Sequence, residues 1–152
     1  MSGWNQQFAK LRYWVTGTGG SNPPPSAFFW LGVTILFMFD FEKLEVYQIA
    51  KGVVTDSLKI ILTNTQLDPY VKDQWKKASL DILLNLAEGT SRMTSADKKH
   101  FITVSRGAVF ECVTILQVLG EIGALPMAEA QNLYDRYEKI SKMLLGMYRS
   151  HE

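Results

Sequence analysis

The 152-residue sequence predicts an all-α protein, an antiparallel up-down-up-down four-helix bundle. Two observations carry this prediction. From Asp40 onward, apolar residues recur at spacings of three and four in four long segments, and no long segment alternates as a β-strand would. Short stretches with capping residues, glycine and proline separate the segments, and such short connections make neighbouring helices antiparallel.

The first two helices are predicted over 40–63 and from Asp68 to about Glu88. Asp68 is a favoured N-cap residue, and Pro69 suits the first helical position. Gly89 is expected to end the second helix, because glycine commonly follows a helix C-terminus. The first helix has its apolar stripe at Tyr47, Ala50, Val54, Leu58 and Ile61. The second has its stripe at Val71, Trp75, Ala78, Ile82 and Leu86.

The third helix is predicted to begin after Thr94 and to end near Ile122, before Gly123. Thr94 and Asp97 resemble a capping box in which the shorter acid replaces Glu. Pro126 then starts the fourth helix. Its outer face carries the favourable i,i+4 pairs Asp135/Lys139 and Glu138/Lys142. Its apolar stripe consists of Ala130, Leu133, Tyr137, Ile140, Leu144 and Met147.

Residues 1–39 form a separate region with only two charged residues, Lys10 and Arg12. A Pro- and Gly-rich stretch precedes an apolar run over 27–39. We consider three interpretations of residues 1–37: a translated leader upstream of a natural start at Met38, a segment that docks on the bundle or a neighbouring subunit, and a membrane anchor. The run is shorter than the ~20 residues that span a bilayer as a helix, so no stable membrane insertion is expected.

The bundle region, residues 40–152, carries the other 14 basic residues and all 15 acidic residues, a net charge of −1. Its third helix has an apolar arc of roughly 200°, whereas a helix at the corner of a bundle needs a little over 100°. Surplus apolar surface indicates association. We therefore expect a homo-oligomer, although residues 1–39 could instead cover this helix. The interface candidates are Leu80, Leu84, Ile102, Val109, Phe110, Val113 and Leu116.

Residues suited to catalysis are scarce, and no enzymatic activity, metal or cofactor is expected. The sequence lacks a Gly-rich phosphate loop, a His-x-x-x-His pair and a Cys-x-x-Cys pair. Cys112 lies on an apolar face, which indicates a core residue rather than a reactive thiol. As the only cysteine, it excludes an internal disulfide and indicates a cytoplasmic protein.

Three polar residues are interpreted as structural: Asn85, Glu88 and Glu111. Glu111 is expected to be at least partly buried, beside valine and isoleucine positions of the third helix. Inward carboxylates occur in di-iron bundles, but there a histidine follows the glutamate three residues later, and neither acid has one here. We expect both acids to form hydrogen bonds at helix ends or subunit contacts.

A candidate nucleic-acid surface is basic but carries interspersed acids (Asp73, Asp81 and Asp97), so it could equally be an ordinary solvated face. An oligomer would repeat the surface, and weak phosphate contacts would then add up. Its residues are Lys76, Lys77, Arg92, Lys98, Lys99 and Arg106.

Several of these segments resemble one known family. The residues that carry the resemblance are Lys76-Lys77-Ala78, Ile82-Leu83-Leu84-Asn85-Leu86-Ala87-Glu88-Gly89, Ser105-Arg106-Gly107-Ala108 and Phe41-Glu42-Lys43-Leu44. They are similar to the four helix bundle proteins encoded in intervening sequences of bacterial 23S ribosomal RNA genes, over roughly Asp40 to Arg149. The chain departs from the family at Asp81-Ile82-Leu83, where Ser-Ile-Pro is usual, and at Thr90, where an aromatic residue is common. The family has no equivalent of residues 1–37, which favours Met38 as the start.

The resemblance implies a homo-oligomer, a pentamer of bundles arranged as a barrel, without enzymatic activity. A related group, the accessory proteins of diversity-generating retroelements, binds reverse transcriptase and template RNA through a strongly basic surface. The net charge of −1 over residues 40–152 argues against that role. It leaves a weaker contact with ribosomal RNA or with a protein as the alternative.

Overall fold

The computed structural model describes residues 39–151, so the three interpretations of residues 1–37 lie outside the described part of the chain. The helices belong to the unit Asp40–Glu152. In chain order they are a 3-10 helix, η1 (Asp40–Lys43), and four α-helices, α3 (Glu45–Thr63), α4 (Pro69–Ser91), α5 (Ser95–Glu121) and α6 (Met127–Ser150).

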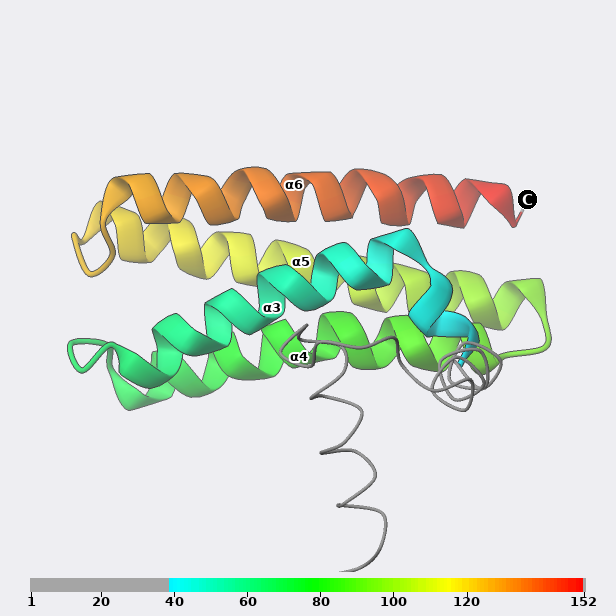
Figure 1. The fold of residues 1–152 in the computed structure, drawn as a ribbon, viewed down its shortest axis with the longest axis horizontal. Helices are drawn as coiled ribbons and strands as arrows, with labels where there is room; N and C mark the ends of the chain where they lie inside the picture. Colours follow the sequence, from blue (N-terminus) through cyan, green and yellow to red (C-terminus); the bar gives the residue numbers. More distant parts are fainter. Residues whose placement is uncertain (1–38, 152) are drawn as a thin grey trace, which may run out of the picture. The chain divides into compact units, whose positions relative to one another are not determined.

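The four α-helices lie side by side and run antiparallel to their neighbours in the chain (Figure 1). α5 packs against α4 and α6, and α3 closes the arrangement by packing against the same two helices. No strand occurs among residues 39–151. The predicted all-α four-helix bundle is therefore confirmed.

The predicted helix starts follow from local hydrogen bonds. The Asp68 carboxylate accepts from the backbone N–H groups of Tyr70 (2.9 Å) and Val71 (3.4 Å), so it caps α4. The Thr94 hydroxyl accepts from the N–H of Asp97 at 3.1 Å and donates to its carboxylate at 2.7 Å. In a full capping box, the side chain of the N3 acid would instead accept a hydrogen bond from the backbone N–H of the N-cap residue. The aspartate therefore supports the cap through the hydroxyl.

Gly123 ends α5 as expected. Its φ of 70° lies in the left-handed region that favours glycine. The N–H of Gly123 donates to Gly120 O (3.2 Å), and the N–H of Ala124 donates to Leu119 O (2.9 Å). This is the Schellman arrangement, which satisfies carbonyls that a helix end would otherwise leave unpaired.

The start of the first predicted helix differs from the structure. Asp40–Lys43 is a 3-10 helix, and α3 begins only at Glu45 because Leu44 has an extended backbone (φ −73°, ψ 125°). The Phe41 ring packs edge-on against Tyr47 at 4.8 Å, and Gln48 Nε2 donates to the carbonyl of Glu42 at 2.6 Å. These contacts fold η1 back onto the first turns of α3.

The prediction that Gly89 ends the second helix is wrong, because α4 continues through it to Ser91. Gly89 is buried, and a Cβ atom built on it would lie 3.0 Å from the Cβ of Phe101 in α5. The glycine therefore permits a close approach of two helices and does not form a turn.

The core lies where the four apolar stripes meet. Burying each large apolar side chain contributes about 1.5–3 kcal/mol. Trp75 is fully buried, and its indole N–H has no hydrogen-bond partner in the described part of the chain. The largest buried side chains are Trp75, Tyr137, Ile61, Ile82, Leu86, Leu116, Leu133, Ile140, Leu144, Val53, Val54 and Val109.

Candidate functional site

Three of the predicted interface residues, Ile102, Val109 and Leu116, are buried inside the chain itself. The reason is that α5 packs closely against both α4 and α6. The flank of its wide apolar arc that carries these three residues is thus used within one bundle. These three side chains have almost no exposed surface to offer to a second copy.

The other candidates remain at the surface. Leu84 and Phe110 are 62% and 51% exposed, Leu80 is 39% exposed, and Val113 is half-buried. Leu80 and Leu84 are four residues apart on the outer side of α4, so they lie one turn apart on one face. We call them the α4 pair.

A second exposed set, on α5 and at its C-cap residue Ile122, was missed as interface candidates. Val104, Val118 and Ile122 are 39%, 52% and 69% exposed. Spacings of fourteen and four residues place them on one face of the helix. Arg106, which contacts Ser141 of α6, lies on the opposite flank. We call the three residues the α5 stripe. The sequence signal that could have identified these residues is their position on the helical wheel of α5, outside the apolar arc that a single bundle needs.

Most of the predicted basic residues are engaged within the chain. Lys76 pairs with Asp73 at 2.9 Å. Arg92 pairs with Glu88, and its guanidinium also stacks over the Phe101 ring at 4.7 Å. Lys77 and Lys98 form no ion pair among the described residues.

Lys99 and Arg106 both contact side chains of α6. The Lys99 ammonium lies over the Tyr148 ring at 4.9 Å. The Arg106 guanidinium lies over the Phe110 ring at 4.8 Å, and its Nε donates to Ser141 Oγ at 3.1 Å. A cavity of about 250 Å³ beside them is lined by Ile102, Thr103, Arg106, Leu145 and Tyr148.

The six basic residues do not form one patch. α4 and α5 run antiparallel (Figure 1). Lys76 and Lys77 in the first half of α4 therefore lie toward the end of the bundle opposite to Lys98 and Lys99. Fifteen residues separate Lys77 from Arg92, which corresponds to about 22 Å along a helix. Arg92, Lys98, Lys99 and Arg106 lie in contrast at the α4–α5 connection or in the first half of α5.

The residues interpreted as structural divide into two groups. Asn85 Nδ2 donates to the carbonyl of Asp81 at 2.8 Å, and Glu88 pairs with Arg92. Glu111, in contrast, is exposed, so the expectation of partial burial is wrong. Its position near the edge of the apolar arc projects it past the helix interface into solvent.

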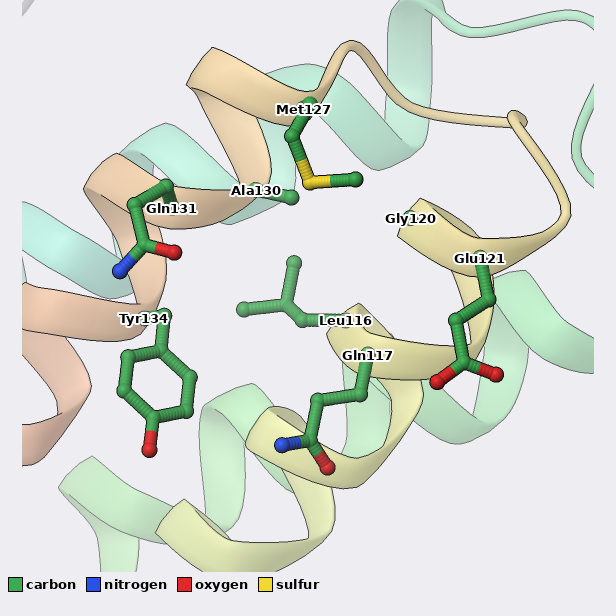
Figure 2. Close-up of a pocket in the computed structure, with 8 residues that line it drawn as sticks. All are labelled: Leu116, Gln117, Gly120, Glu121, Met127, Ala130, Gln131 and Tyr134. Carbon is green, nitrogen blue, oxygen red and sulfur yellow. The ribbon is translucent and has the colours of Figure 1, made fainter.

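A shallow groove of about 410 Å³ runs between the second half of α5 and the first half of α6 (Figure 2). Leu116 lies at its base, and the Tyr134 and Met127 side chains face it from α6. The full lining is Leu116, Gln117, Gly120, Glu121, Met127, Ala130, Gln131 and Tyr134. Its polar groups are two amides, one phenol and one carboxylate, spread along the rim.

No cluster of three or more His, Cys, Asp or Glu side chains suited to a metal ion occurs within residues 39–151. Cys112 is fully buried, and burial raises the pKa of its thiol to about 11. The thiol is therefore protonated at neutral pH. By length and composition, α5 alone among the described helices could span a membrane, a test that a bundle's core helix also passes.

The described fold defines a class, the four-helix bundle with exposed apolar side chains on two adjacent helices. Residues 42–146, from η1 into the last turns of α6, match the family described as 23S rRNA-intervening sequence protein. The chain belongs to this family. No match was found among curated proteins.

Proposed function

We propose that this chain is a non-enzymatic interaction or scaffold protein of the cytoplasm, and that it works as a homo-oligomer, a ring of five copies. The observation that supports this proposal most directly is the exposure of the α4 pair and the α5 stripe. Large apolar side chains at helix surfaces cost free energy in water, and burying them against another copy recovers it.

A ring places two requirements on each copy. Its interfaces are heterologous, so every subunit presents two different surfaces, and each surface meets the other kind on the next subunit. The α4 pair and the α5 stripe lie on different helices and provide two such surfaces. We assign one to each side of the proposed interface.

The test is sedimentation velocity of the full chain and of two variants, Leu84→Glu and Val118→Glu. Each substitution places a charge on one surface and leaves the other intact, because both side chains are more than half exposed. We expect the unaltered chain to sediment as a pentamer and each variant as a monomer. An equimolar mixture of the variants should form dimers, since one functional surface of each kind remains.

Leu62→Glu in α3 is the matched control, because Leu62 is a leucine more exposed than Leu84 and lies outside both surfaces. It should assemble as the unaltered chain does, and circular dichroism should show equal helix content in all variants. A monomeric unaltered chain would contradict self-assembly. A mixture that stays monomeric would show that the two surfaces do not contact each other.

The alternative is an RNA-binding accessory factor, for ribosomal RNA or an RNA associated with reverse transcriptase. The supporting observation is the pair Lys99 and Arg106, which have no acidic partner among the described residues. Both lie over aromatic rings, and both contact α6. A ring would present this pair once per subunit, and repeated weak phosphate contacts gain affinity by avidity. The net charge of −1 over residues 40–152 limits this electrostatic contribution.

Filter binding to ribosomal RNA at 50 and 200 mM salt tests the alternative. RNA binding through phosphates weakens steeply with salt, and Lys99→Gln/Arg106→Gln should reduce both the affinity and the salt dependence. Lys59→Gln/Lys142→Gln removes two lysines that are paired with acids and serves as the control. Equal binding by both double variants would reject this surface as an RNA site.

A further inference from the structure

Four polar side chains meet in the centre of the bundle, one from each helix: Ser57 of α3, Ser79 of α4, Cys112 of α5 and Tyr137 of α6. All four are fully buried, with no exposed surface. Ser57 Oγ and Tyr137 Oη lie 2.8 Å apart, and Ser79 Oγ and Cys112 Sγ lie 3.6 Å apart. We call these residues the polar layer.

The two pairs are also neighbours of each other. Burial raises the pKa of the Tyr137 hydroxyl, and the neighbouring Cys112 raises it further. Ser57 and Ser79, which also lie beside this hydroxyl, lower its pKa. Each of the four groups can both donate and accept a hydrogen bond. None of them is left without a partner, since the unpaired buried side-chain atoms in the described residues belong to Trp75 and Arg92.

The polar layer interrupts a core whose other side chains are mainly apolar. Leu, Ile and Val side chains above and below it attract without direction, so sliding one helix by a turn would exchange one apolar contact for another. The same slide would move a hydroxyl away from its partner and leave it buried and unpaired, which costs much more than the bond itself contributes.

We propose that the polar layer fixes the register of the four helices, so that the bundle has one packing and not several of similar free energy. Tyr137 is the central member, because its phenol reaches across the core to α3. A buried polar group that sets register is known from coiled coils, where it reduces stability and gains specificity.

The first test is a double-mutant cycle on the full chain with Tyr137→Phe, Ser57→Ala and both together. Each single variant leaves one buried hydroxyl without its partner. We expect each to lower the equilibrium constant for folding about tenfold, measured by urea unfolding. The double variant should lose clearly less than the product of the two single effects. Additive effects would overturn the proposal.

The second test asks whether the packing stays unique. The variant Ser57→Ala/Ser79→Ala/Cys112→Ala/Tyr137→Phe removes the whole layer. We expect it to keep its helical circular dichroism but to bind the dye ANS and to show several sets of backbone amide resonances. If it does not fold, the double variant of the first test is measured in the same way. One sharp set of resonances without dye binding would contradict a role in register.

Ser105→Ala is the matched control for both tests. Ser105 is equally buried in α5, but its hydroxyl donates to the backbone carbonyl of Ile82 (2.8 Å) and not to the layer. This variant should lose stability and keep one set of resonances. If it became heterogeneous as well, loss of any buried hydroxyl would explain the result, and the layer would have no special role.

Discussion

Gly89 and Gly107 both lie inside helices, but their surroundings differ. At Gly89 the backbone of α4 comes so close to α5 that a Cβ would lie 3.0 Å from the Cβ of Phe101. The Phe101 Cβ is fixed by its own helix and cannot move away alone. At Gly107, on the exposed side of α5, nothing lies within 4 Å of an added Cβ.

This difference predicts opposite effects of alanine at the two positions. Gly107→Ala should stabilise the protein by about 1 kcal/mol, the intrinsic helix preference for alanine. Gly89→Ala gains the same preference but forces the helices apart, and overpacking of this kind costs ~1–3 kcal/mol. It should therefore destabilise the protein by about 1 kcal/mol. Urea unfolding of both variants measures the difference in stability. Equal stabilisation by the two alanines would contradict the predicted steric clash at Gly89.

At the scale of elements, the α3–α6 contact is the only one among residues 39–151 that an ion pair between helices holds. Arg136 Nη1 lies 2.9 Å from Asp56 Oδ2, and Lys59 also pairs with Asp56 at 3.2 Å. Hydrogen bonds from Arg136 and then Lys59 lower the pKa of the Asp56 carboxyl below its usual value. The pair is partly exposed, so its contribution to stability is modest.

The lowered pKa sets the pH range in which this pair acts. The carboxylate is favoured in the folded state, so its contribution is complete above the unfolded pKa near 3.9 and is lost as pH falls through the lower folded value. Asp56→Asn should therefore destabilise the protein by about 0.5 kcal/mol at pH 6 and by less at pH 2.5. Asp135→Asn, outside any ion pair among the described residues, is the control. Urea unfolding at both pH values would contradict the assignment if the Asp56→Asn effect did not change.

The helices themselves could be predicted from the sequence because their signals are local. Spacing of apolar residues, the Asp68 cap and the Gly123 turn each act within a few positions. Gly89 could not be interpreted correctly, because glycine near a helix end has the same local appearance whether it turns the chain or admits a neighbour. Only the position of Phe101 in α5 decides between them.

The candidate surface was harder to predict for the same reason. The wheel of α5 shows a wide apolar arc but not which parts of it α4 and α6 cover. Ile102 and Leu116 thus appeared as free surface although they are core, while Val118 and Ile122 are exposed. The polar layer was missed because Ser57 and Ser79, each on an apolar stripe, become informative only when their partners on other helices are known.

At the scale of the whole molecule, self-assembly has a thermodynamic signature. A ring binds only folded subunits, so assembly stabilises the folded state by mass action. The melting temperature of the unaltered chain should rise by several degrees over a hundredfold increase in protein concentration, measured by circular dichroism. For Leu84→Glu it should stay constant. A constant melting temperature for both chains would contradict the proposed oligomer.

The buried indole of Trp75 gives this bundle a built-in optical signal. The other three tryptophans, Trp4, Trp14 and Trp30, all precede the described residues. Replacing them with phenylalanine would leave a single tryptophan, buried in the core. Because the ring is fully buried, its emission should lie at short wavelength and shift red on unfolding. The emission wavelength of Trp75 would then report whether the four helices are packed together.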